Sequence, residues 1–186
     1  MKLDAITVCY GEQTVLQAFS AQIEERGCVC IMGRNGSGKT TLLRVLAGLT
    51  VPQSGEVQDP ISPVAYLFQE DRLLPWLSAM ENLLFFAGKE RRAEAEKWLN
   101  RFGLDTKDRR ALAQYSGGMR QRAALALAFC AQSRLLLLDE PLQGLDAQYA
   151  AILRQAISEQ KLEKSVVLVT HDEALASDVA DQRILL

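Results

Sequence analysis

Short apolar runs alternate with amphipathic stretches along this chain of 186 residues. Two such runs near its start predict a pair of antiparallel strands with a turn between them, at residues 3–9 and 15–23. Further patterns predict strands at 28–32, 64–68, 135–138 and 166–169, and helices at 40–49, 79–103, 117–130 and 147–160. Because strands that alternate with helices favour a parallel sheet covered on both faces, we predict an α/β fold with a mostly parallel sheet and a helical insert.

Composition narrows the class of protein. Hydrophobic residues make up 48% of the chain and charged residues 24%, which is typical of a globular domain. The net charge of −2 lacks the basic excess of a general nucleic-acid binder, so no nucleic-acid partner is expected. Apolar runs fall short of the roughly 20 residues that span a bilayer, and Asp4 interrupts any signal segment. We therefore expect a single cytosolic domain. The four cysteines lie in apolar stretches, which favours buried structural thiols over a metal site.

A glycine-rich loop stands between the predicted strand at 28–32 and the predicted helix at 40–49. It fits the pattern G-x-x-x-x-G-K-[ST] and consists of Gly33, Arg34, Asn35, Gly36, Ser37, Gly38, Lys39 and Thr40. Glycines let successive backbone N–H groups turn toward a phosphate, and the positive end of the following helix points at the same oxygens. Lys39 is expected to reach the β- and γ-phosphates, and the Thr40 hydroxyl to bind Mg²⁺. The next residue, Thr41, completes the predicted phosphate-loop set. A plain turn with an exposed lysine is the alternative.

Two carboxylates, Asp139 and Glu140, end the apolar strand predicted at 135–138. Unpaired charge at the end of a buried strand is costly, which indicates a functional task. Asp139 fits the strand-end carboxylate that holds Mg²⁺ in P-loop NTPases. Glu140 then lies where it can act as general base on a water that attacks the γ-phosphate. The alternative is a pair of acidic residues that merely begin a loop.

A second glycine turn precedes an alanine-rich helix, in the run Tyr115-Ser116-Gly117-Gly118-Met119-Arg120-Gln121-Arg122. Ser116 is a good N-cap, and the glycines leave the first helix amides open. The start of this helix is therefore a second anion-binding surface. Two such surfaces within one chain would crowd a nucleotide, whereas two chains can hold the nucleotide between them.

In this order, the motifs resemble the ATP-binding subunit of ABC transporters over nearly the whole chain. The resemblance implies ATP hydrolysis with ATP and Mg²⁺ as cofactors. It also implies a homodimer in which the second glycine turn, at residues 116–119 and here called the signature turn, completes the site of the other subunit. It assigns catalysis to Glu140, His171 and Lys39. It adds nucleotide contacts from Tyr10, Ser116, Gly117 and Gly118, and Mg²⁺ contacts from Thr40, Gln69 and Asp139. Taken singly, Tyr10 could be a turn or core aromatic, Gln69 an ordinary strand end, and His171 a neighbour of a helix cap.

The resemblance also implies an organisation and a location. The whole chain, 1–186, is expected to be one ABC ATPase domain, with a core at about 1–72 and 132–186 and a helical subdomain at about 73–131. A multi-spanning membrane permease is the expected partner, with the subunit at the cytoplasmic face of the membrane. The segment at 69–77 is similar to importers for nitrate, sulfonates and taurine, which predicts a small anion as solute. Residues 73–77 fit either a groove for the permease or a local mini-core.

Several positions depart from the family pattern. Met119 replaces the usual signature glutamine, Tyr115 replaces a leucine, and Gln143 stands where a small residue is usual. The chain also ends sooner after His171 than the family does. Two alternative functions therefore stay open: a non-transport ABC ATPase, for example in cluster assembly, and a nucleotide-binding regulator that does not hydrolyse ATP. A small-molecule P-loop kinase would lack the signature turn.

Overall fold

The computed structural model describes residues 1–70 and 72–186. In chain order its elements are β1 (Lys2–Tyr10), β2 (Gln13–Gln22), β3 (Gly27–Met32), α1 (Lys39–Leu46), β4 (Ser54–Gln58), β5 (Val64–Leu67), α2 (Ala79–Ala87), the 3-10 helix η1 (Lys89–Arg91), α3 (Arg92–Arg101), the 3-10 helix η2 (Leu112–Gln114), α4 (Gly117–Cys130), β6 (Leu135–Asp139), α5 (Ala147–Gln160), β7 (Ser165–Val169), α6 (Glu173–Val179) and β8 (Gln182–Leu185).

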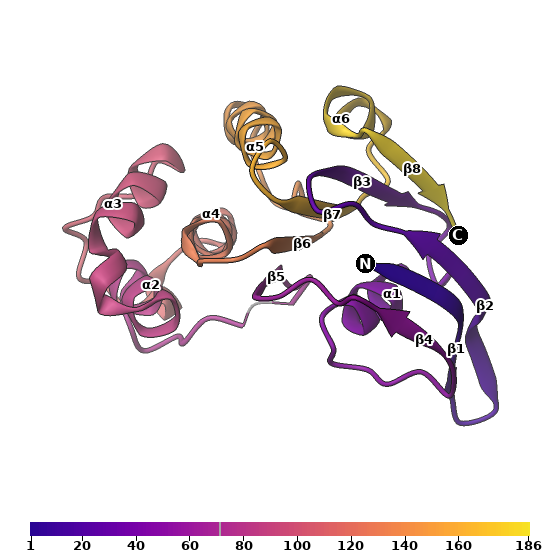
Figure 1. Ribbon diagram of the computed structural model, residues 1–186. Helices are drawn as coiled ribbons and strands as arrows, with labels where there is room; N and C mark the ends of the chain where they lie inside the picture. Colours follow the sequence, from indigo (N-terminus) through magenta and orange to yellow (C-terminus); the bar gives the residue numbers. More distant parts are fainter. Residues whose placement is uncertain (71) are drawn as a thin grey trace.

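The strands form two sheets. A five-stranded sheet of parallel pairs has the order β5-β6-β7-β3-β8, and a three-stranded antiparallel sheet has the order β2-β1-β4. Figure 1 shows α5 and α6 on one face of the larger sheet and α1 on the other. The predicted α/β fold, with a mostly parallel sheet and N-terminal antiparallel strands, is confirmed.

The central strands β6 and β7 are buried along their whole length, and their side chains alternate between two hydrophobic clusters. Leu135 and Leu137 belong to the cluster that α1 covers, together with the antiparallel sheet. Leu136 and Leu138 belong to the cluster on the opposite face, which continues into the helical segment. The rigid centre of the molecule is therefore the sheet itself, and the carboxyl ends of β3, β6 and β7 are held firmly relative to one another.

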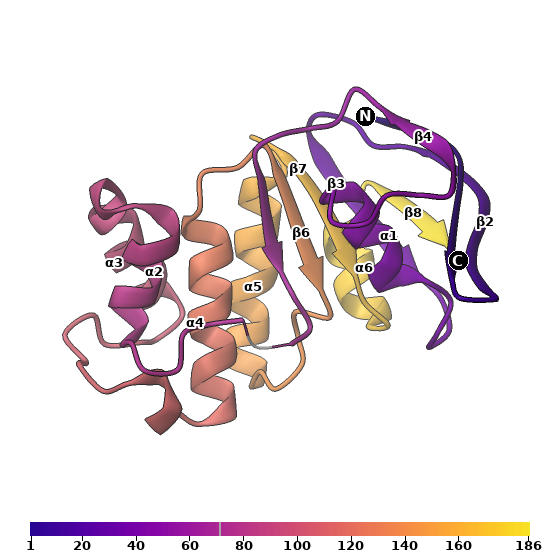
Figure 2. The same ribbon diagram turned by 90° about the horizontal axis from the view of Figure 1, so that it is seen from below.

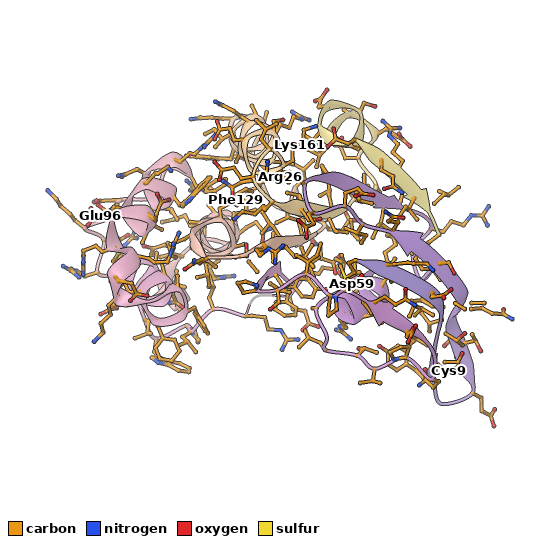
Figure 3. All side chains as sticks on the ribbon, viewed as in Figure 1. Cys9, Arg26, Asp59, Glu96, Phe129 and Lys161 are labelled. Atoms are coloured by element: carbon orange, nitrogen blue, oxygen red, sulfur yellow. The ribbon has the colours of Figure 1, made fainter. Side chains whose placement is uncertain are left out.

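The helical segment between β5 and β6 packs on α4. Figure 2 shows α4 lying between the sheet on one side and α2 and α3 on the other. Trp98 of α3, Phe102 just after this helix and Phe129 of α4 pack together, with ring centroids 4.9–6.1 Å apart. Figure 3 labels Phe129 beside α4 and Glu96 on the outer side of α3. The division into a core and a helical subdomain, with its predicted boundaries, stays a prediction.

Three expectations about elements need correction. The helical pattern at 79–103 is divided into α2, η1 and α3, because Gly88 takes a φ of 102° that no helix continues through. The helix expected at 40–49 ends at Leu46, since Gly48 turns the chain with a φ of 70°. The sequence patterns also missed β4, α6 and β8. The first is an exposed polar edge strand, and the other two are short.

Across the part of the chain that the structure describes, no helix has both the length and the apolar character needed to cross a membrane.

Candidate functional site

The phosphate loop joins the end of β3 to the start of α1. At Gly38, which has a φ of 97°, a Cβ atom would lie 2.9 Å from the carbonyl oxygen of Val15, so only glycine fits. Within the described residues no side chain caps α1, and its first turn holds no acidic residue, whereas side chains cap α2, α4 and α6. The amides and positive end of α1 are therefore open to an anion.

Lys39 folds back over the loop that precedes it. Its Nζ donates hydrogen bonds to the carbonyl oxygens of Gly33, at 3.0 Å, and Arg34, at 2.9 Å. Only 8% of its surface is exposed. The same loop contains the buried hydroxyl of Ser37, which has no hydrogen-bond partner in the described part of the chain. The loop therefore contains both a positive charge, on Lys39, and, among the described residues, a polar atom without a partner, on Ser37.

A cleft of about 460 Å³ collects most of the residues predicted to bind nucleotide and metal. Its lining is Tyr10, Val15, Asn35, Gly36, Gly38, Lys39, Thr40, Thr41, Gln69, Asp139, Glu140 and Val169. Tyr10 ends β1 at the cleft and is 48% exposed, so it is not a core aromatic. Its pKa is lowered, chiefly by a hydrogen bond with the Thr41 hydroxyl, which ties it to the first turn of α1.

Asp139 closes β6 and is only 2% exposed. In the described structure neither of its carboxylate oxygens has a partner at ordinary hydrogen-bond geometry. Burial raises its pKa above the ordinary 3.8, and the Thr40 hydroxyl is the largest opposing influence. Because the pKa is raised on folding, this group stabilises the fold only at low pH, and the contribution is lost as pH rises through the raised pKa. A bound cation would therefore stabilise the ionised form of the Asp139 carboxylate.

The donor set around Asp139 fits Mg²⁺. The hydroxyl of Thr40, the amide of Gln69 and the carboxylate of Asp139 line one cleft, and all three supply the oxygen ligands that Mg²⁺ prefers. Mg²⁺ is commonly held by one or two carboxylates together with substrate phosphates, rather than by a cage made of protein alone. The described residues contain no group of three or more His, Cys, Asp or Glu that could hold a metal.

Glu140 follows Asp139 with a strained backbone. Its φ of 47° is unusual for a residue with a side chain and costs about 1–3 kcal/mol. The Glu140 N–H donates to the Val169 carbonyl oxygen at 2.9 Å, and its carbonyl accepts from the Gln143 N–H at 3.1 Å. These bonds hold the turn and direct the carboxylate to His171, whose Nδ1 lies 2.9 Å from Oε2. The strained backbone therefore orients the carboxylate of Glu140.

His171 stands in the short turn between β7 and α6, where both neighbours fix the backbone. The Thr170 hydroxyl accepts a hydrogen bond from the Asp172 N–H at 3.0 Å, and the Asp172 carboxylate caps α6 through the Leu175 N–H at 2.7 Å. Sequence reasoning found the histidine and missed these two supports. Their signal is the Thr and Asp on either side of it, which are common in turns and at N-caps.

A second cleft, of about 370 Å³, adjoins the first. The residues Asn35, Gln69 and Glu140 line both clefts. The second is completed by Leu142, Gln143, Thr170, His171 and Asp172. The structure therefore brings together the phosphate loop, Gln69, both strand-end carboxylates and His171.

The signature turn lies at a different cleft, of about 260 Å³. It is lined by Ser116, Gly118, Met119, Arg122, Gly144, Leu145, Asp146 and Tyr149, none of which lines the phosphate-loop cleft. Ser116 caps α4 by accepting the Met119 N–H at 3.2 Å. A Cβ at Gly118 would lie 3.2 Å from the Gly144 carbonyl oxygen, so glycine lets the two turns pack closely. In one chain, then, the two anion-directed surfaces do not meet.

The departures from the family pattern have local explanations. Tyr115 is buried, and the Arg110 guanidinium lies 5.4 Å from its ring centroid. Met119 contributes its backbone N–H to the Ser116 cap, which needs no particular side chain. Gln143 lines the cleft that contains His171. Beyond His171 the chain still forms α6 and β8, and β8 pairs with β3.

The volume of a cleft does not identify the site. A larger cleft, of about 710 Å³, lies between α3, α5 and the starts of β6 and β7, at the opposite end of the sheet from Asp139. It contains Arg91, Trp98 and Lys164, and none of the residues predicted to bind nucleotide or metal.

Comparisons with known proteins agree with this geometry. Residues 16–143 match the family model for ABC transporters. An aliphatic sulfonates import ATP-binding protein of Xanthomonas axonopodis pv. citri is 40% identical over 195 residues, and the alignment covers all of this chain and 67% of that protein. A similar import protein of Pectobacterium atrosepticum is also 40% identical, with 73% of its length covered.

Solved structures give the same result. The dimeric structure of a bacterial ABC transporter cassette superposes on this chain with a TM-score of 0.87 and 31% identity, covering the whole chain and 93% of the cassette. That cassette is also known in a dimeric post-hydrolysis state bound to ADP and phosphate, with a TM-score of 0.85.

Proposed function

Because the chain belongs to the ABC transporter family and is an ATPase of that family, we propose that two copies close around two ATP molecules and that this closure powers a membrane importer. The observation that carries the proposal is the division of the site between two clefts. One holds the phosphate loop, Asp139 and Glu140, and the other holds Ser116. A head-to-tail pair of chains brings each kind of cleft against the other.

The proposed chemistry is attack of a water oxygen on the γ-phosphorus, with loss of the bond to the β-γ bridging oxygen. Glu140 takes the proton from water, and the products are ADP and phosphate. His171 orients Glu140 through Nδ1, and only an imidazole that carries a proton on both nitrogens also donates from Nε2 to the γ-phosphate. Lys39 and the amides of α1 stabilise the charge on the transferring phosphoryl group. Mg²⁺ held by Thr40, Gln69 and Asp139 supplies further charge neutralisation when bound. Closure of the dimer excludes water and strengthens these interactions.

Substitution of Ser116 by arginine separates binding from dimer closure. Because Ser116 lies outside the phosphate-loop cleft, Ser116→Arg is expected to leave the ATP affinity of the monomer unchanged within about twofold. A bulky cation at the signature turn should block the dimer, so that hydrolysis falls by more than about 100-fold. Titration with a fluorescent ATP analogue and sedimentation with ATP measure the two effects. A loss of monomer affinity would contradict a site shared between chains.

An apolar groove lies beside β5. About 260 Å³ in volume, it is lined chiefly by apolar side chains of β5, of α4 and of the segment after β5, including Leu73 and Leu127, together with Phe86 of α2. Phe86 is 49% exposed, and the neighbouring Phe85 is also exposed. We propose that a short helix of a multi-spanning permease seats here, at the cytoplasmic face of the membrane. Leu73 lines the groove and also packs against the core, which is compatible with both of the roles considered for the segment at 73–77.

The solute of the proposed importer is a small anion such as nitrate, a sulfonate or taurine. The names of the relatives, which import aliphatic sulfonates, support this assignment. The similarity covers the ATP-binding part alone, and this chain does not itself contact the solute in the proposed complex.

Purification of the native complex tests the importer. A multi-spanning membrane protein is expected to co-purify with the chain, and Phe86→Glu is expected to release it without loss of ATP binding. Leu162→Glu is the matched control, because Leu162 is 69% exposed and lies outside the groove. Mass spectrometry of the purified complex identifies the partner. Equal release by both variants would contradict the groove as the contact with the permease, and recovery of cytosolic partners only would favour a non-transport ATPase.

A further inference from the structure

Two buried polar groups, the hydroxyl of Tyr66 and the carboxylate of Asp139, lie on neighbouring strands at the predicted metal site. Tyr66 lies on β5, and Asp139 ends the neighbouring strand β6. Tyr66 pairs with Leu137, so Asp139, two residues further on, projects from the same face of the sheet. Residues in this diagonal relation are within reach of a long aromatic side chain. Tyr66 and Leu137 both belong with the cluster that α1 covers, so the two groups lie under the phosphate-loop helix.

Both groups are shielded from solvent. In the described structure the Tyr66 hydroxyl and the two Asp139 oxygens are buried and have no partner at ordinary hydrogen-bond geometry. Burial raises the pKa of Tyr66, and the nearby charge of Asp139 raises it further. A phenol that keeps its proton is a donor, and a buried carboxylate needs donors to stay ionised.

The ring of Tyr66 is itself held in place. It stacks on Phe68, with ring centroids 4.0 Å apart and planes inclined by 21°. The guanidinium of Arg72 lies 5.2 Å from the Phe68 centroid. Phe68 immediately precedes Gln69, and Phe68, Arg72 and Tyr66 also line the apolar groove beside β5. The groove therefore shares Tyr66 and Phe68 with the strand that lies beside Asp139.

We propose that Tyr66 is a positioning residue for the metal site: its hydroxyl donates to Asp139 and fixes the carboxylate in the orientation that presents it to Mg²⁺ beside Thr40. This inference rests on the proposed role of Asp139 in holding Mg²⁺. The stack through Phe68 makes the position of Tyr66 depend on the groove, so a partner that moves Phe68 also moves the hydroxyl. No feature of the sequence motifs assigns a role to Tyr66.

The inference is tested with Tyr66→Phe, which removes the hydroxyl and keeps the stacked ring. Loss of a hydrogen bond to a metal-binding side chain typically weakens metal affinity by about 10–100-fold. We expect Mn²⁺ to bind about tenfold more weakly to the variant in the presence of ATP. Electron paramagnetic resonance of Mn²⁺ measures this directly, with all proteins carrying Glu140→Gln so that ATP is not consumed. ATP affinity in EDTA and the thermal unfolding midpoint are expected to stay unchanged, because ring packing is retained.

Asp139→Asn in the same background distinguishes the two ways in which the experiment can fail. If Asp139→Asn binds Mn²⁺ and ATP normally, the proposed metal role of Asp139 is wrong. If Asp139→Asn loses Mn²⁺ while Tyr66→Phe binds it within twofold of the parent, the metal site stands and the positioning role of Tyr66 is overturned. A loss of ATP affinity by Tyr66→Phe in EDTA would also overturn it, since the effect would then lie outside the metal site.

Discussion

Replacement of Glu140 by glutamine is expected to lower steady-state ATP hydrolysis by about 10²–10⁴-fold, the usual contribution of a general base. Glutamine has nearly the same size and keeps the polar contact with His171, which lies 2.9 Å from the carboxylate. It cannot accept the proton of the attacking water. ATP binding should be unchanged, because the phosphate loop and Asp139 are untouched. The nucleotide then stays intact between two chains, so the variant should accumulate as an ATP-bound dimer.

Two measurements check this expectation. Phosphate release at high protein concentration, where a dimer forms, gives the rate, and sedimentation with and without ATP gives the dimer. Glu163→Gln is the matched control, because Glu163 is exposed and lies in the cleft at the other end of the sheet. Unimpaired turnover by Glu140→Gln would remove Glu140 from its role. If the unsubstituted chain shows no turnover either, the chain is a nucleotide-binding regulator.

The sequence predicted which residues come together at the candidate site better than it predicted the outer elements of the fold. The phosphate loop is a local motif, and its geometry follows from glycine positions such as Gly38 that no other residue can occupy. The buried strands β6 and β7 each contain a run of four apolar residues, which makes them easy to recognise. By contrast, β4 is polar and exposed, and it forms only because β1 offers it a pairing edge. Local patterns contain no information about such a partner.

Contacts between residues that are distant in the sequence could not be predicted from it either. Asp139 and Glu140 were found as a pair, but the positive φ of Glu140 and its contact with His171 depend on how β6 and β7 lie side by side. From the sequence alone, Tyr66 is an ordinary aromatic residue of a predicted strand. Its relation to Asp139 exists only in the register between β5 and β6. The separation of Ser116 from the phosphate loop is likewise a property of the folded chain, and it supports a site shared between two chains.

Replacement of Lys39 by alanine is expected to abolish ATP binding at the concentrations that saturate the unsubstituted chain. Lys39 is nearly buried, and its Nζ is held over the loop by the carbonyls of Gly33 and Arg34. Its charge is thus positioned before the phosphates arrive. Truncation of a buried partner in a charge pair costs about 2–5 kcal/mol, or roughly 30- to several-thousand-fold in affinity. Calorimetric titration with ATP measures the loss, and Lys164→Ala, in the cleft at the other end of the sheet, is the matched control.

The Lys39→Ala and Glu140→Gln variants should differ in kind as well as in degree. Without Lys39 the nucleotide is not held, so neither the dimer nor hydrolysis is expected. Without the Glu140 carboxylate the nucleotide is held and only its cleavage fails. The double variant should therefore behave like Lys39→Ala, because binding precedes chemistry. Thermal unfolding without nucleotide should change little, since water can replace Lys39 at the two carbonyls. An ATP-bound dimer of the double variant would contradict the role of Lys39 in the phosphate loop.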